Sequence, residues 1–171
     1  MDIFNEWIVK KKKSGKDYAI TAGIILGGLI LIFVSSALAQ YLASFYLLLV
    51  AAIIYGMYIG ITSLNVEYEY SVTNGELDID KIISRRKRKR LVSVHSKNFE
   101  YFAPLNDSHK AAFDSPSITK KIDACSSFNS DKVYFAIYFK NNEKVRITFE
   151  PTERMIEDFS RYVPRSMYYV K

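Results

Sequence analysis

The chain carries successive hydropathy patterns, and the first of them predicts membrane-spanning helices. From Tyr18 to Leu64 the sequence contains no Asp, Glu, Lys or Arg. A helix needs about 20 apolar residues to cross a bilayer, so this block has room for two spans and a tight turn. We place the spans at about residues 17–38 and 42–64, because Gln40 is the most polar point between them. The block therefore predicts a two-span transmembrane helical hairpin over residues 17–64.

A cleaved signal peptide is the alternative for the first span, since lysines precede it and Ser35-Ser36-Ala37 offers small residues near its end. The apolar run is longer than the roughly 7–15 residues of a signal core, and a second apolar run follows at once. Two retained spans are therefore the expectation.

Four glycines indicate how the two spans pack. Gly23 and Gly27 form one small-xxx-small motif, and Gly56 and Gly60 form another. Such motifs let helix backbones approach closely in lipid. In a hairpin centred between residues 41 and 42, Gly23 faces Gly60 and Gly27 faces Gly56. The alternatives to packing within the hairpin are contact between two copies of the chain and a chance occurrence of the glycine spacing.

After Leu64 the pattern changes to an alternation of apolar and polar residues, which is typical of half-buried strands. Residues 66–72 and 76–82 both alternate, and Asn74-Gly75 between them is a strong hairpin signal. Further strands are expected at about residues 91–94, 98–102, 119–126, 133–139 and 145–149.

One helix is expected after the last strand. Pro151 suits a first helical turn, Glu153 is favourable near the N-terminus, and Pro164 ends the helix. Its apolar face consists of Met155, Ile156, Phe159 and Val163. About seven strands closed by one helix predict a mainly antiparallel β domain over residues 65–164, followed by a tail at 165–171.

The charged residues are unevenly distributed along the chain, so the average composition is misleading. A net charge of +6 and 49% hydrophobic residues describe an ordinary soluble domain, yet the charges lie outside the apolar block. Lysines 10–13 and Lys16 precede the first span, the basic run 85–90 follows the second, and the turn has no basic residue. The positive-inside rule then places both termini in the cytoplasm, with residues 1–16 as a basic cytoplasmic tail.

The basic run at residues 85–90 is the most specific candidate for a binding site. It comprises Arg85, Arg86, Lys87, Arg88, Lys89 and Arg90. Contact with anionic lipid headgroups is the functional interpretation, and the lysines before the first span, Lys10, Lys11, Lys12 and Lys13, would join it. A topology signal in a solvated turn and an acidic protein partner are the alternatives. Nucleic acid is not expected, because no aromatic residues interleave the run.

Little in the sequence indicates catalysis. His95, His109 and Cys125 do not lie at metal-ligand spacing, so neither a metal nor a cofactor is expected. Asp78 and Asp80 share one strand face, which is explained by solvent exposure. The apolar block has no ionisable acidic or basic side chain, which argues against a transporter or pump. A single cysteine argues against a disulfide scaffold.

The polar region resembles the pleckstrin-homology-like domains of small bacterial membrane proteins, the bacterial PH or YcxB-like class. The resemblance rests on residues 68–74 leading into Glu76-Leu77-Asp78-Ile79, on the basic stretch that runs into Leu91-Val92-Ser93-Val94, and on Phe149-Glu150-Pro151 before the last helix. It implies a PH-like fold after a pair of N-terminal spans, in a bacterial protein.

These observations together predict a non-enzymatic integral membrane protein. Its cytoplasmic PH-like domain would contact anionic phospholipid or protein partners at the inner membrane face. The alternative is an accessory subunit of a larger membrane complex, docked through exposed strands or through the loop at residues 104–116. A homo-oligomer is compatible with either function.

Overall fold

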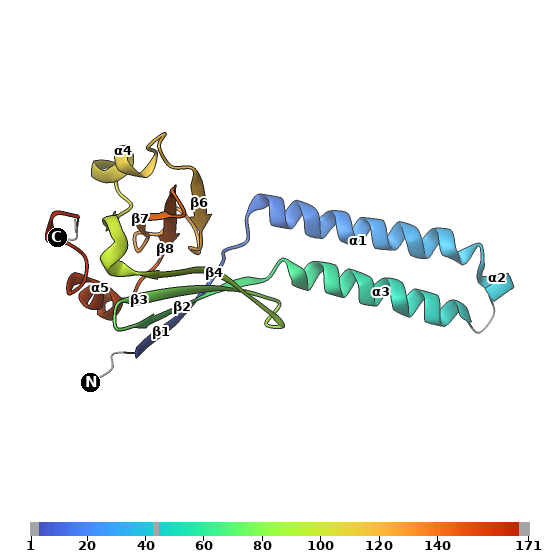
Figure 1. The fold of residues 1–171 in the computed structure, drawn as a ribbon. Helices are drawn as coiled ribbons and strands as arrows, with labels where there is room; N and C mark the ends of the chain where they lie inside the picture. Colours follow the sequence, from blue (N-terminus) through green and yellow to red (C-terminus); the bar gives the residue numbers. More distant parts are fainter. Residues whose placement is uncertain (1–3, 43–44, 168–171) are drawn as a thin grey trace. The chain divides into compact units, whose positions relative to one another are not determined.

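The chain forms two compact units, and one of them is inserted in the sequence of the other. The computed structural model describes residues 4–42 and 45–167. Lys12–Val66 forms a helical hairpin, and the two segments Met1–Lys11 and Glu67–Lys171 together form a β domain (Figure 1). The first strand of the β domain therefore precedes the hairpin in sequence, and all its other elements follow.

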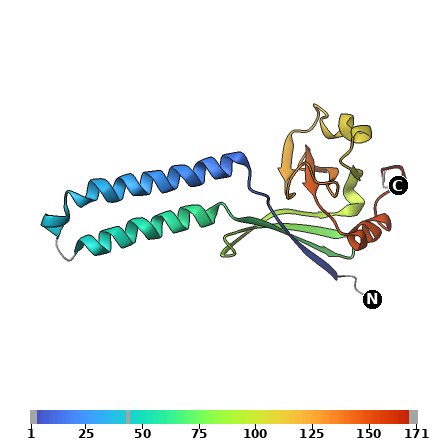
Figure 2. The same cartoon turned by 180° about the vertical axis from the view of Figure 1, so that it is seen from behind.

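The hairpin consists of two long helices, α1 at Gly15–Ser36 and α3 at Phe45–Ser63, which lie side by side (Figure 2). Both are long and apolar enough to cross a membrane. A capping box sets the start of α1, since the Ser14 side chain accepts from the Asp17 amide and the Asp17 carboxylate accepts from the Ser14 amide. The short helix α2 at Ala39–Leu42 lies where a tight turn was expected.

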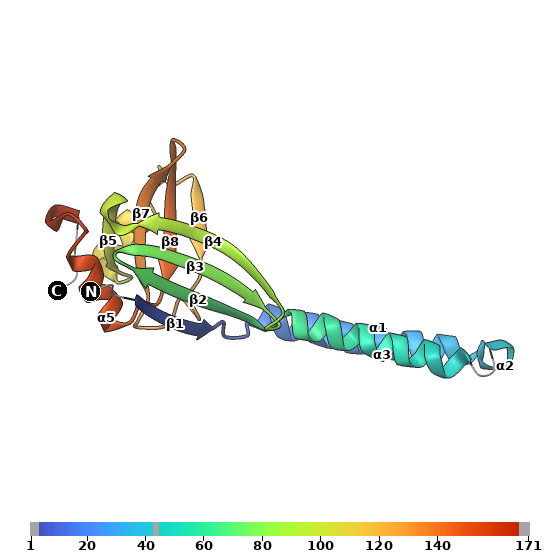
Figure 3. The same cartoon turned by 60° about the horizontal axis from the view of Figure 1, so that its bottom comes forward.

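The β domain contains two four-stranded sheets. The first has the order β1-β2-β3-β4 (Figure 3). Its strands are Phe4–Lys10, Val66–Thr73, Glu76–Ile83 and Lys87–His95. The second has the order β5-β7-β8-β6, and β6 pairs with β8 in parallel. Its strands, in chain order, are β5 Phe99–Pro104, β6 Lys120–Asp123, β7 Tyr134–Lys140 and β8 Glu143–Phe149. All seven strands expected from the sequence are present.

The N-terminal strand β1 was not expected, because residues 1–16 were interpreted as a tail. Antiparallel pairing with β2 places Trp7 opposite Tyr70 and Val9 opposite Tyr68. Val9 is buried there, at 8% exposure. The apolar residues Trp7, Ile8 and Val9 are consecutive rather than alternating, and lysines follow immediately, so the local strand signal is weak. Pairing with a distant partner is what makes it a strand.

The last helix, α5 at Glu153–Ser160, packs on an aromatic core. Thr152 caps it, since its side chain accepts from the Met155 amide, so the helix begins after Pro151 rather than at it. Met155 and Phe159 are fully buried. The Phe159 ring contacts Phe99, Phe102 and Phe149, at centroid distances of 5.9, 5.4 and 6.1 Å. A shorter helix, α4 at Lys110–Phe113, lies within the segment expected as a loop.

The turn between β2 and β3 is the expected Asn-Gly hairpin. Asn74 and Gly75 have φ of 50° and 82°, the pair of positive values that a two-residue turn requires. The Gly75 amide donates to the Asp158 carboxylate of α5 at 3.1 Å, and a Cβ at Gly75 would overlap the Tyr162 ring. This turn is therefore fixed against the terminal helix.

Candidate functional site

The basic run is divided between a turn and a strand. Arg85 lies in the turn between β3 and β4 with φ of 55°, and β4 begins at Lys87. All six basic side chains are exposed. Successive residues of a strand point to opposite faces, so the part of the run in β4 presents arginines on one face and lysines on the other.

The arginines form ion pairs with acidic residues of β2 and β3. Arg85 lies 3.5 Å from Glu67, between Nε and Oε1. Arg88 contacts Glu69 at 2.6 Å between Nη2 and Oε2. Arg90 reaches Asp78 at 2.7 Å and also donates through its guanidinium to the Asp80 carboxylate. Arg85, Arg88 and Arg90 are therefore each ion-paired within the β domain.

The acidic partners are more buried than the sequence suggested. Asp80 is 6% exposed and Glu69 is 7% exposed. The expectation that Asp78 and Asp80 lie on a freely exposed face is wrong for Asp80, because the Arg90 side chain covers it. The hydrogen bond to Asp80 raises the pKa of the Arg90 guanidinium. The sequence did carry a signal for these ion pairs. Acidic residues lie two positions apart on β2 and on β3, and so do Arg88 and Arg90 on β4.

The lysines of the hairpin have a different environment. Lys89 lies directly opposite Lys81, and Lys87 lies opposite Ile83. Alternation along the two strands places these lysines on the face opposite to that of the ion-paired arginines. In the described ranges, none of these three lysines has an acidic partner. They form a basic patch, Lys81, Lys87 and Lys89, which we call the lysine face.

The four lysines at positions 10–13 are exposed. Lys10 ends β1 opposite Glu67, whose carboxylate pairs with Arg85. Lys12 and Lys13 belong to the helical hairpin unit and directly precede the Ser14 cap of α1. They retain the position expected for basic residues flanking a span.

Helix packing uses different glycines from those expected, with one exception. A Cβ at Gly28 would overlap the Met57 side chain, and a Cβ at Gly60 would lie 3.2 Å from Ile24. At Gly23, Gly27 and Gly56 it would meet no atom within 4 Å. Helix α2 replaces the symmetric turn, and one residue of shift rotates a helix by about 100°. Gly28 consequently packs against Met57, and Gly60 packs against Ile24.

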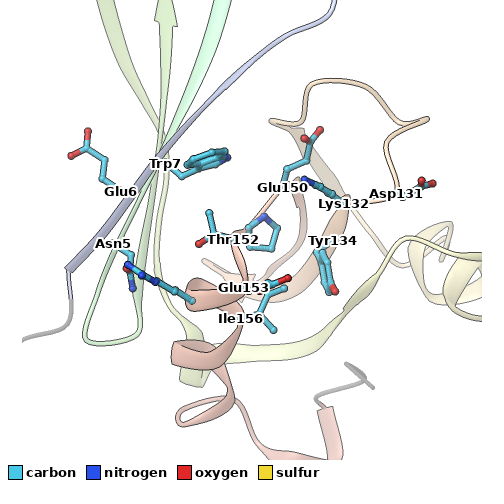
Figure 4. Close-up of a pocket in the computed structure, with 12 residues that line it drawn as sticks. Asn5, Glu6, Trp7, Asp131, Lys132, Tyr134, Glu150, Thr152, Glu153 and Ile156 are labelled. Carbon is cyan, nitrogen blue, oxygen red and sulfur yellow. The ribbon is translucent and has the colours of Figure 1, made fainter.

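A groove of about 610 Å³ opens between β1 and the start of α5 (Figure 4). The Trp7 side chain points into it, toward Glu150 and Thr152. Its acidic side chains are Glu6, Asp131, Glu150 and Glu153, and its basic ones are Lys132 and Arg154. The sequence analysis missed this groove, because it depends on where β1 lies.

The remaining chemically capable side chains have structural roles. Cys125 is 7% exposed, and burial raises the pKa of its thiol to about 11. The Tyr101 hydroxyl and His109 Nδ1 lie 2.8 Å apart, and His95 packs edge-on against Tyr162. Within residues 4–42 and 45–167 no group of three potential metal ligands is found.

A family model described as "Bacterial PH-like domain" matches residues 1–169. A search of the curated proteins found no match, and neither did a search of the solved structures. The matched range includes the helical hairpin and β1 as well as the strands that follow.

Proposed function

This chain belongs to the bacterial PH-like domain family, and from that premise we propose that it is a two-span membrane protein whose β domain contacts anionic lipid headgroups through the lysine face. PH-like domains are generally binding modules, which favours recognition over catalysis. In this proposal, the ion pairs between the arginines and the buried acidic residues stabilise the β domain, and the lysines contact the lipid headgroups.

Strand pairing supports a hairpin that crosses the membrane twice. Lys10 faces Glu67 in the register of β1 and β2, so the two ends of the inserted apolar segment start from adjacent strand positions. Both ends must therefore lie on the same side of any membrane that α1 and α3 cross. The basic residues at both ends, with none in the turn, favour the cytoplasmic side.

The observation that carries the proposal is the absence of acidic partners around Lys81, Lys87 and Lys89 in the described ranges. Lys89 opposite Lys81 places two like charges together, an arrangement that is unfavourable without a counter-charge. An anionic headgroup supplies that charge, at about 1 kcal/mol for each basic residue near the surface. Arg88 and Arg90 are satisfied by Glu69, Asp78 and Asp80 and add little to this contact.

The test is hydrogen–deuterium exchange of the full chain in nanodiscs of neutral or anionic lipid. We expect residues 81–89 to be more protected in anionic discs, and salt to remove the difference because it screens surface charges. Replacing Lys81, Lys87 and Lys89 with Gln should abolish the protection.

The matched control replaces Lys120, Lys121 and Lys140 with Gln, since these lysines are exposed on the second sheet and the change in charge is equal. This variant should keep the lipid-dependent protection. Equal exchange of residues 81–89 in neutral and anionic discs would refute the lipid proposal. So would loss of protection in the control variant alone.

The accessory-subunit function remains the second candidate, and two exposed aromatic side chains favour it. Phe128 and Phe139 are 50% and 53% exposed. Exposed aromatic residues are enriched in protein interfaces. A stoichiometric partner that is lost on replacing Phe128 and Phe139 with Ser, together with lipid-independent exchange, would support this function instead.

A further inference from the structure

The first sheet has two edges, and they differ in character. β1 and β4 are its outer strands. The β4 edge carries four consecutive basic residues, Lys87–Arg90, and such charges oppose pairing between sheet edges. The β1 edge carries only two charged residues, Glu6 and Lys10, and these have opposite signs. Phe4, Trp7 and Ile8 are 62%, 49% and 47% exposed along it. An edge strand with exposed apolar residues is a template for pairing with another strand.

The charged residues of β1 are Glu6 and Lys10, and the ion pairs found in the described ranges include neither of them. Glu6 and Lys10 are both exposed. Both share a strand face with Ile8, because the three alternate along the strand. An acid and a base placed symmetrically about an apolar residue make β1 complementary to itself in the antiparallel direction.

We propose that two copies of this chain pair antiparallel through the free edges of their β1 strands, with Ile8 of one copy opposite Ile8 of the other. In this register Glu6 of each copy faces Lys10 of the other, and Trp7 faces Val9. Opposite charges that face one another across strands stabilise the pair. Two such ion pairs form at once, because a two-fold axis repeats every contact.

The neighbouring registers lack this complementarity. If the two-fold axis passed through Trp7, Glu6 would lie opposite Ile8 and Phe4 opposite Lys10. An axis at Glu6 brings two carboxylates together, and an axis at Val9 leaves Glu6 without Lys10 as its partner. The charge pattern of β1 therefore selects one register. The inference does not depend on lipid contact, since it uses another strand and another set of side chains.

The register is tested by disulfide formation in the full chain, in native membranes, on a Cys125→Ser background. Paired Cα atoms of antiparallel strands lie about 4.5–5.5 Å apart, within reach of a disulfide. Ile8→Cys should therefore give a cross-linked dimer on mild oxidation. Phe4→Cys is the matched control, because it keeps both charges while the two Phe4 positions are offset by eight residues, about 26 Å. Asn129→Cys, on an exposed loop, measures random collision.

Exchange of the charges at Glu6 and Lys10 provides a second test of the register. Glu6→Lys and Lys10→Glu should each lower the dimer yield of Ile8→Cys several-fold, and the combination of both should restore it. Trp7 is the single tryptophan, so its fluorescence shows whether each variant keeps β1 in place. Cross-linking of Ile8→Cys at the level of Asn129→Cys would overturn the proposal. A yield unchanged by single charge reversal, or not restored by the double exchange, would do the same.

Discussion

Lys10 and Glu67 face one another at the ends of β1 and β2, although the entire helical hairpin separates them in the sequence. The hairpin thus occupies the connection between two adjacent antiparallel strands, a place where a turn of two residues would suffice. The β domain has its own core, with Tyr70 of β2 packed edge-on against Phe149 of β8 at 5.9 Å. The pairing of β1 with β2 consequently adds an edge strand to a domain that has its own core.

We therefore expect that the β domain can be excised with its fold intact. Replacing residues 12–65 with Asn-Gly should join β1 to β2 through a short turn in the observed register. The product should be soluble, mainly β by circular dichroism, and should unfold cooperatively. Cooperative unfolding followed through Trp7 would show that β1 is part of the folded unit.

The control for the excision is a fragment of residues 66–171, which lacks β1. Its free energy of unfolding should be lower by about 2 kcal/mol, because Val9 is lost and Tyr68 is uncovered. Equal stability of the two proteins in urea would show that β1 is not part of the domain in solution.

Topology is best tested with cysteines other than the native one. The raised pKa of the buried Cys125 keeps its thiol protonated and unreactive near neutral pH. In a Cys125→Ser background, Gln40→Cys should react with an impermeant maleimide in intact cells. Asn129→Cys should react only after permeabilisation. The reverse pattern would place the β domain outside the cytoplasm and contradict the proposed orientation.

Substitution of glycines should distinguish the observed helix contact from the one expected by symmetry. Gly28→Leu should disturb the packing of α1 on α3, because the new side chain overlaps Met57. Gly27→Leu should have little effect, since nothing lies within 4 Å of its Cβ position. The measurement is disulfide formation between Ile24→Cys and Gly60→Cys in a Cys125→Ser background. Faster cross-linking of Gly23→Cys with Gly60→Cys would favour the symmetric pairing instead.

The contact between Asp158 and the Gly75 amide should be important for stability. Asp158 is 2% exposed and accepts this bond at 3.1 Å. Asp158→Ala should lower the free energy of unfolding by about 2 kcal/mol, the value typical of a buried hydrogen bond to a charged group. Asp158→Asn keeps an acceptor oxygen and should retain most of the stability. Chemical denaturation of the full chain in detergent checks both, and equal losses would point to a packing effect.

Much of the β domain was predictable because its signals are local. The alternation after Leu64, the Asn74-Gly75 turn and the apolar face around Phe159 each act over a few residues, so seven strands and the terminal helix were expected near their actual positions. The arginines were harder to interpret, since their partners lie on other strands. Arg88 needs both β2 and β3 beside it before Glu69 and Asp80 come within reach.

The sequence by itself determined the two apolar helices, because a long run without charged residues constrains the local environment whatever its neighbours are. It also determined the strand periodicity. Only the tertiary structure decided that Phe4–Lys10 is a strand, that Gly28 rather than Gly27 makes the helix contact, and that Arg90 covers Asp80. Each of these depends on a partner distant in sequence or on a rotation of one residue. The physical reason is that burial and ion pairing depend on what faces a residue, and the periodicity of one segment does not contain that information.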